Sequence, residues 1–143
     1  MAAAVEFHTG VADPLDFTCR LLRKAYRRGA QLLATAPPGL LDELDRALWT
    51  FEERDFVPHV RFPTANPAIA ARTPIWLAPR AVEAAVGRVL VNLGAAAPER
   101  AEAFERIIEV VGADADSAAA GRERWRAYKA AGLEIQHHPF KAA

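Results

Sequence analysis

The sequence has few of the residues on which several common functions depend. Among its 143 residues there is one cysteine, Cys19, and one serine, Ser117. A single cysteine excludes an internal disulfide and is typical of the reducing cytoplasm. The eight glycines are never closer than seven residues apart, so neither a G-x-G-x-x-G nor a G-x-x-x-x-G-K-[ST] motif can be written. The usual dinucleotide and P-loop modes of binding are therefore excluded.

The chain also lacks an excess of positive or negative charge, and it has no long apolar run. Eighteen basic and eighteen acidic side chains give a net charge of zero, so no overall field attracts nucleic acid. No apolar run reaches transmembrane length, and the N-terminus has no signal-peptide pattern. With 52% hydrophobic residues the chain can build one sizeable core. We expect a single cytoplasmic domain over residues 1–143 that does not contact membranes.

Candidates for catalysis and metal binding are weak. Cys19 lies on the apolar side of an expected helix and is interpreted as a core residue. Ser117 lies near the start of another expected helix, and neither residue has a base beside it in the sequence. His137 and His138 are adjacent, so on a strand they point in opposite directions and do not chelate by spacing. We expect no catalytic residues, no metal and no cofactor.

Strand and helix patterns alternate along the chain. They predict an open α/β sheet with mostly parallel strands. The expected strands are 2–8, 31–35, 74–78, 88–93 and 106–111, with 133–136 as a possible edge strand. The expected helices run from Pro14 to Gly29, from Pro37-Pro38 to Leu48, from Pro98 to Phe104, and from an Asp114 or Asp116 cap to Gly132.

The segment 50–73 has no sustained period and is interrupted by prolines. A connection of this length without regular structure is uncommon in a compact domain and is often functional. Trp49 and Phe56 flank its first part. Two interpretations stay open with equal weight: the two rings close over the sheet as core, or they form an exposed contact patch for a partner.

The most informative segment is 122–132, Arg-Glu-Arg-Trp-Arg-Ala-Tyr-Lys-Ala-Ala-Gly. On a helix, Arg122, Trp125, Arg126 and Lys129 share one face. Burial of three unpaired cations is unfavourable, so this face suits a surface that binds a ligand both acidic and apolar. Counted with Arg124, the segment 121–143 carries a net charge of +3. The alternative is a solvated basic helix with Trp125 half-buried against the sheet.

Three segments together resemble the chi subunit family of bacterial DNA polymerase III. They are Leu-Asp-Arg-Ala-Leu-Trp at 44–49, Phe-Val-Pro-His at 56–59 and the motif at 122–132. The similarity extends over essentially the whole chain in length and element order. The resemblance implies a Rossmann-like domain, with helices on both faces of an open, mostly parallel, twisted sheet and without nucleotide-binding activity.

The resemblance also implies two partners. One is the psi subunit of the clamp loader, contacted through Trp49, Phe56, Val57, Pro58 and His59. The other is the acidic C-terminal tail of single-stranded-DNA-binding protein, bound by a set matched here by Arg122, Trp125, Arg126, Lys129 and Gly132. Members often have tyrosine at the position of Trp125 and lysine at that of Arg126, and some have a basic residue where Ala118 stands.

The expected function is thus that of a non-catalytic accessory subunit in replication, which meets DNA only indirectly. One alternative is an enzyme that binds a nucleotide or another small molecule on the α/β sheet. Another is a direct nucleic-acid binder that uses the basic C-terminal helix, which the zero net charge argues against.

Overall fold

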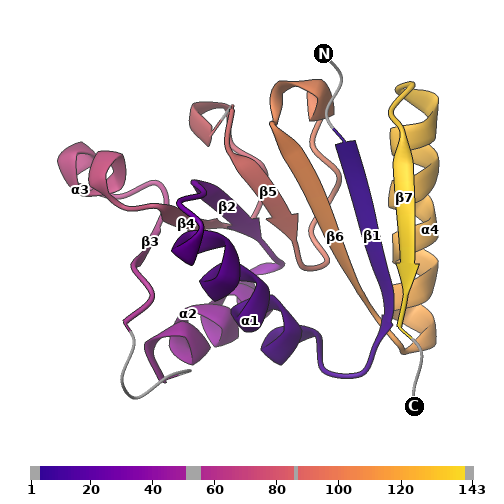
Figure 1. Ribbon diagram of the computed structural model, residues 1–143, viewed down its shortest axis with the longest axis horizontal. Coiled ribbons are helices and arrows are strands. Elements are labelled where there is room, and N and C mark those ends of the chain that lie inside the picture. The colour runs from indigo at the N-terminus through magenta and orange to yellow at the C-terminus, as the bar shows by residue number, and fades with distance from the viewer. Residues whose placement is uncertain (1–3, 51–55, 86, 141–143) are drawn as a thin grey trace.

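A single seven-stranded sheet forms the centre of the molecule (Figure 1). The computed structural model describes residues 4–50, 56–85 and 87–140. The strand order is β3-β4-β2-β5-β6-β1-β7, and every pairing between these strands is parallel. The strands are β1 Ala4–Val11, β2 Leu32–Thr35, β3 His59–Arg61, β4 Ile75–Ala78, β5 Val89–Asn92, β6 Arg106–Gly112 and β7 Ile135–Pro139. The α/β class and the open parallel sheet predicted from the sequence are confirmed.

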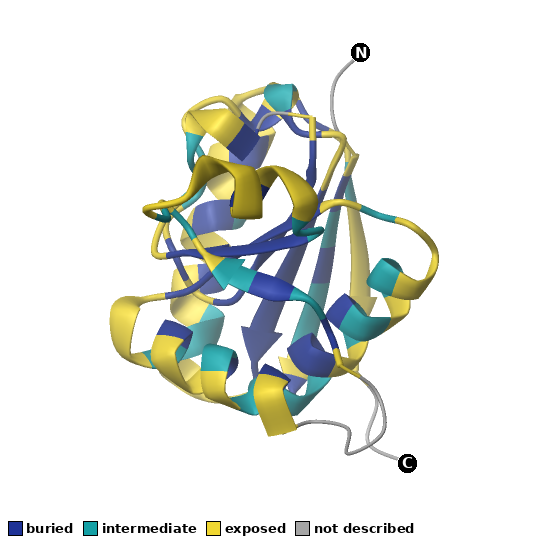
Figure 2. Cartoon of the chain, turned by 90° about the vertical axis from the view of Figure 1, so that its left-hand side faces the viewer, coloured by how far each residue is buried: buried dark blue, intermediate teal, exposed yellow. Residues whose placement is uncertain are grey.

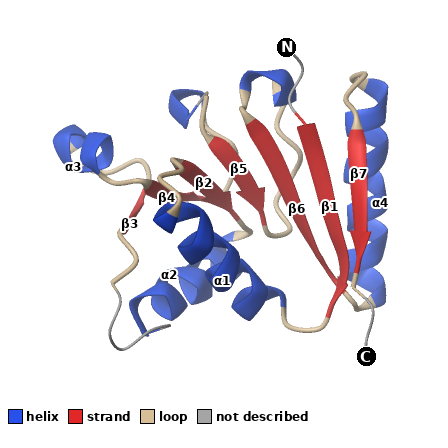
Figure 3. Cartoon of the chain, in the orientation of Figure 1, coloured by secondary structure: helices blue, strands red, loops and turns tan. Residues whose placement is uncertain are grey.

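Helices cover both faces of the sheet (Figure 3). They are α1 Pro14–Arg27, α2 Pro38–Thr50, α3 Pro67–Arg72 and α4 Ala115–Ala130, with 3-10 turns η1 Glu83–Ala85 and η2 Ala101–Ala103. One face is packed by α1 and α2, and the other by α4 with residues from α3, η1 and η2. In the parts of the chain that the structure describes, no helix has the length and apolarity to span a membrane.

The helix ends follow the signals in the sequence. The Asp13 carboxylate caps α1 by accepting from the Asp16 N–H, and Pro14 occupies the first position. Asp114 is the N-cap of α4 and accepts from the Ser117 N–H at 2.9 Å. Gly132, with a φ of +81°, follows the end of α4. The expected caps at Asp13 and Asp114 are therefore confirmed.

The core lies on both sides of the central strands (Figure 2). Every residue of β2, β4 and β5 is buried, which explains why these strands appear in the sequence as short continuous apolar runs. Residues of β1 instead alternate between buried and partly exposed. The β1–β7 end of the sheet therefore has side chains that are available to a ligand.

The expectation of a structureless connection over 50–73 was wrong in part. The segment contains β3, which extends the sheet edge, and α3, capped by Asn66 with Pro67 at its first position. Three residues are too few for β3 to show an alternating pattern. The Asn66-Pro67 pair was a usable helix signal. Residues 51–55 lie outside the described residues.

Smaller corrections concern the middle and the end of the chain. The helix expected over 98–104 is only the 3-10 turn η2, and the turn η1 was not expected. The last strand runs over Ile135–Pro139, later than the expected 133–136, and lies beside β1 at the sheet edge. Its side chains are mostly exposed, so it lacks the apolar alternation by which strands are found.

Candidate functional site

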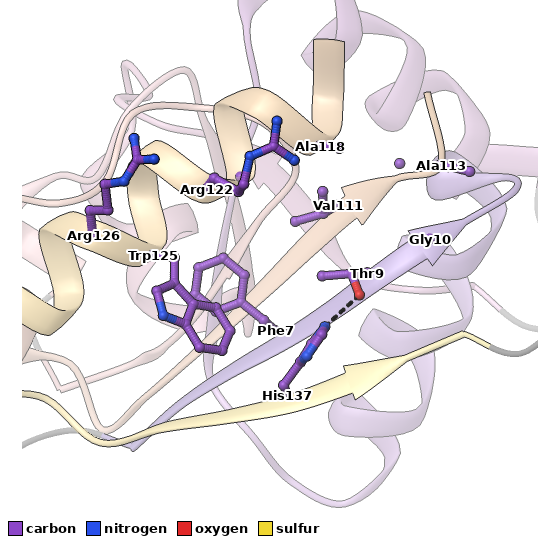
Figure 4. A pocket seen from close by; sticks show the side chains of 12 residues that line it. Phe7, Thr9, Gly10, Val111, Ala113, Ala118, Arg122, Trp125, Arg126 and His137 are labelled. Atoms are coloured by element: carbon purple, nitrogen blue, oxygen red, sulfur yellow. Dashed lines mark hydrogen bonds between the residues drawn. The ribbon is translucent and has the colours of Figure 1, made fainter. Parts of the chain in front are cut away.

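A pocket lies between α4 and the carboxyl ends of β1 and β6 (Figure 4). Its volume is about 520 Å³. It is lined by residues of β1, β6, the β6–α4 connection, α4 and β7: Phe7, Thr9, Gly10, Val111, Gly112, Ala113, Ala118, Gly121, Arg122, Trp125, Arg126 and His137. In open parallel sheets ligands bind at the carboxyl ends of strands. This pocket, which we call the α4 pocket, is the candidate site.

Two cations border the α4 pocket. Arg122 and Arg126 leave successive turns of α4 on the same side in Figure 4, and both are exposed. Arg126 donates to the carboxylate of Glu123 at 2.6 Å, in an ion pair whose members are both about 70% exposed (69% and 72%). Exposed pairs of this kind are weak, so Arg126 can exchange Glu123 for an external anion.

The wall beneath these cations is aromatic. The half-buried indole of Trp125 packs on Phe7 with ring centroids 4.9 Å apart. His137 of β7 meets the same indole edge-to-face at 5.5 Å, and its Nε2 is hydrogen-bonded to Oγ1 of Thr9 at 2.6 Å. The indole thus contributes to the apolar core and still presents a surface to the pocket. Trp125 is therefore half-buried against the sheet and also lines the pocket.

Small residues bring α4 close to the sheet. A Cβ at Gly121 would lie 2.9 Å from Cγ1 and 3.0 Å from Cγ2 of Val111, so only glycine allows this approach. Ala118, one turn earlier, leaves room at the pocket edge. On the opposite side Gly10 has a φ of +68° within an irregularity of β1 between His8 and Val11. These residues decide the width of the pocket.

A buried polar network holds α4 from below. Glu109 of β6 is fully buried and accepts from Arg124 at 2.7 Å, from Tyr128 at 2.6 Å and from Asn92 at 2.9 Å. Burial raises the pKa of the Glu109 carboxyl, whereas the Arg124 charge and the three hydrogen bonds act in the opposite direction. Arg124 is therefore neutralised inside the protein and adds nothing to the positive surface. The net charge of +3 counted for 121–143 therefore overstates the positive charge at the surface.

The structure separates the residues of the predicted stripe. Arg122, Trp125 and Arg126 line the α4 pocket, while Lys129 is exposed on α4 beyond the pocket lining. Gly132 lies after the helix, where its positive φ ends α4. The three upstream residues thus share a site that Lys129 and Gly132 do not line.

A second candidate surface is aromatic and lies on the α2 side of the molecule. Trp49 at the end of α2 and Phe56 before β3 are 60% and 58% exposed, with ring centroids 5.1 Å apart. Trp49 also packs edge-to-face on His59 at 5.0 Å. Their exposure shows that the interpretation of the two rings as core was wrong. We call Trp49 and Phe56 the aromatic patch.

The neighbours of the aromatic patch are its support. Val57 is only 1% exposed and belongs to the core beneath α2, and His59 is buried as well. Ring nitrogens of His59 lie 2.7 Å from the Val57 carbonyl oxygen and 3.0 Å from Oδ1 of Asp45. Pro58 between them is partly exposed. These contacts fix the segment 57–59 to α2, and a partner can reach Trp49 and Phe56 more readily than Val57 or His59.

Cys19 and Ser117, the weak candidates for catalysis, both have structural roles. Cys19 is buried in the core, which confirms its interpretation, and burial followed by Asp16 and Asp13 raises its pKa to about 11. Ser117 lies in the first turn of α4 under the Asp114 cap, also as expected. At the start of α1, the carboxylates of Asp13 and Asp16 disfavour the phosphate that many α/β proteins bind there.

Sequence reasoning missed the pocket residues that α4 does not supply. Phe7 and Thr9 lie on β1, and His137 lies on β7, more than a hundred residues later in the chain. No local spacing in the sequence connects them. Glu109 could have been suspected, because it is the one charged residue inside the apolar run Ile107–Val111. An acidic residue in a buried strand requires a buried partner.

Comparison with known proteins gives a consistent result. Residues 1–136 match the family described as "DNA polymerase III chi subunit, HolC". A relative from Pseudomonas aeruginosa, "DNA polymerase III subunit chi", is 32% identical over 131 residues, which cover 89% of each chain. The chain therefore belongs to the DNA polymerase III chi subunit family.

Proposed function

We propose that this chain is a non-catalytic accessory subunit that links the clamp loader of the replicative polymerase to single-stranded-DNA-binding protein. Its family places it in DNA replication with DNA polymerase III. In this proposal the α4 pocket binds the acidic C-terminal tail of single-stranded-DNA-binding protein, and the aromatic patch binds the psi subunit. DNA is then met only through these partners.

The single observation that carries the tail assignment is the pairing of two exposed guanidinium groups with an aromatic pocket. Arg122 and Arg126 can donate charge-assisted, bidentate hydrogen bonds to the terminal carboxylate and upstream acidic side chains of a peptide. An apolar terminal ring would enter beside Trp125 and Phe7. A ligand that is acidic and ends in an aromatic residue uses both features at once.

The expected affinity is moderate. A hydrogen bond to a charged group contributes ~1.5–3 kcal/mol, and burial of one aromatic ring adds ~1.5–3 kcal/mol. Ordering of a flexible tail opposes these gains, so binding is expected on the order of micromolar, about 8 kcal/mol. Such a contact releases readily, and several tails on one binding-protein oligomer would strengthen it by avidity.

The psi assignment is supported by the exposure of the aromatic patch. Large exposed rings at a well-supported site are typical centres of protein interfaces. Trp49 and Phe56 pack on each other and on the fixed His59 ring, so little side-chain entropy would be lost on binding. Val57, Pro58 and His59 then position the rings, with Pro58 partly accessible to the partner.

The tail assignment is tested by titration of a labelled acidic peptide ending in Pro-Phe. We expect Arg126→Ala and Trp125→Ala each to weaken binding by about tenfold or more. Lys24→Ala removes one exposed cation from α1, on the other face of the sheet, and serves as the matched control. Affinity retained in both pocket variants would reject the assignment, as would equal binding of a peptide that lacks the terminal phenylalanine.

The psi assignment is tested by co-purification with the psi subunit of the same organism. Trp49→Ala and Phe56→Ala should each reduce recovery of the complex. Phe140→Ala removes a comparably exposed ring, 57% exposed, at the end of β7 and should have no effect. Full recovery with the Trp49→Ala/Phe56→Ala double variant would contradict the assignment.

A further inference from the structure

A cluster of potential metal ligands lies on the face of β1 and β7 opposite the α4 pocket. Glu6 and His8 are two residues apart on β1, so their side chains share one face. His138 of β7 is the direct cross-strand partner of His8. One ligand atom from each of the three side chains lies within 4.8 Å of the others. β1 and β7, which lie side by side in Figure 1, bring them together from opposite ends of the chain.

The α1-facing side of the sheet is apolar over its central strands and changes to charged and imidazole side chains at this end. Ile108 and Val110 of β6 belong to the core under α1, whereas Glu6, His8 and His138 are intermediate or exposed. The cluster is therefore open to solvent and to ions. Only the ring of Phe17 from α1 reaches it among the aromatic contacts of the described chain, with its centroid 5.4 Å from that of His8.

We propose that Glu6, His8 and His138 bind a divalent transition-metal ion, with Zn²⁺ as the best match. Two imidazoles and one carboxylate are a ligand set that zinc uses, with water in the remaining position. The set fixes β7, an edge strand, to β1. The ion would act as a clamp on the last strand of the sheet.

The carboxylate is already oriented for this role. Arg106 donates from Nε to Oε2 of Glu6 at 2.5 Å, which leaves Oε1 directed toward His138, whose Nε2 lies 3.8 Å away. Metal-binding carboxylates are commonly held by a further hydrogen bond of this kind. The positive charge of Arg106 opposes a cation nearby, so we expect moderate affinity. Arg106 therefore orients the Glu6 carboxylate and also limits the affinity of the site for the metal ion.

The imidazoles need a small movement. Ligand atoms on a tetrahedral zinc ion are about 3.4 Å apart, given bonds of about 2.0–2.1 Å. The rings of His8 and His138 stack with centroids 4.9 Å apart, and His138 has a side chain 48% exposed on an edge strand, so it can turn toward the ion.

Adjacent histidines provide an internal control. His137 points to the other face, where it contacts Thr9 and Trp125, whereas His138 stacks on His8. Replacement of His137 therefore removes an imidazole of the same strand and similar exposure without touching the cluster. This pair separates a defined site from the general affinity of surface histidines for metal.

The test is titration of the tag-free full chain with CoCl₂, followed by its visible absorption, and with ZnCl₂ by calorimetry. The wild type and His137→Ala should bind one ion each. His138→Ala and Glu6→Gln should lose at least tenfold in affinity, and Zn²⁺ should raise the Tm of the wild type but not of His138→Ala. Circular dichroism without metal verifies that each variant is folded.

Two results would overturn the proposal. One is the absence of saturable one-to-one binding in the wild type, which would leave an ordinary cross-strand ion pair. The other is equal affinity in the wild type and in folded His138→Ala, which would show that the ion lies elsewhere. Loss of peptide binding at the α4 pocket bears on neither result, so this test is independent of the proposed function.

Discussion

Arg124 donates from Nε to Oε1 of Glu109 at 2.7 Å, and both side chains are buried between α4 and β6. The pair fixes the helix that carries the α4 pocket to the strand beneath it. Tyr128, one turn after Arg124, donates to Oε2 of the same carboxylate, so two successive turns of α4 share one acceptor. The orientation of Arg122 and Arg126 toward solvent follows from this attachment on the inner side.

Loss of one partner from this pair should be costly. Arg124→Met leaves a buried carboxylate without its charge partner, and we expect the free energy of unfolding to fall by about 3–5 kcal/mol. Urea denaturation measures the loss. The Arg124→Met/Glu109→Gln double variant, which also removes the charge, should recover part of it. A double variant less stable than Arg124→Met would contradict the charge-pair explanation.

Gly121→Ala should destabilise the protein, although alanine favours a helix. The new Cβ would meet the stiff, buried Val111 side chain at 2.9 Å, a clash expected to cost about 1–3 kcal/mol. The matched control is Gly39→Ala in α2, where nothing lies within 4 Å of an added Cβ, so a gain of about 0.5–1 kcal/mol is expected. Thermal unfolding of both variants provides the comparison, and a shift of the same sign in the two would refute the close-approach argument.

Glu123 should weaken the proposed peptide binding by competing for Arg126. The ion pair is exposed, so its removal in Glu123→Gln should strengthen binding of the acidic peptide by about two- to fivefold at low salt. The gain should disappear as salt is raised, because exposed charges are screened. Fluorescence anisotropy at two salt concentrations measures both effects. Weaker binding in Glu123→Gln would show that Glu123 assists the ligand instead.

Cys19 should be unreactive in the folded protein at neutral pH. Its pKa of about 11 lies above its usual value, so the thiolate that attacks a disulfide reagent is scarce below that pH. Burial also blocks access to the thiol. Reaction with a chromogenic disulfide at pH 8 should be slow in buffer and complete in concentrated urea. Fast reaction in buffer would indicate that the α1 face opens.

Much of the fold could be predicted because its signals are local. Asp13-Pro14 and Asp114 mark helix starts through hydrogen bonds within one turn, and the runs at β2, β4 and β5 are apolar because both faces of each strand are covered. The three-residue strand β3 fell outside this reach. It is fixed by pairing with β4, which the local pattern does not contain.

For the candidate sites too, local spacing predicted some features and missed those that depend on other elements. Helical spacing correctly grouped Arg122, Trp125 and Arg126, but it also admitted Lys129, because spacing defines a face and not where a cavity on that face ends. Arg124 was included in the net charge of 121–143, but its partner, Glu109, lies on another element fifteen residues away and neutralises it in the core. For Trp49 and Phe56, residue type alone left open whether the rings are exposed, which depends on how α2 and the segment before β3 pack.

From the amino-acid sequence we could derive the α/β class, the ends of the long helices, the basic and aromatic character of α4, and the family resemblance. These depend on side-chain chemistry within a few turns of chain. The folded chain was needed to establish which residues face the α4 pocket, which arginine is neutralised in the core, and that Glu6, His8 and His138 lie close together. Those outcomes depend on the pairing of β1 with β6 and β7, which joins residues more than a hundred positions apart.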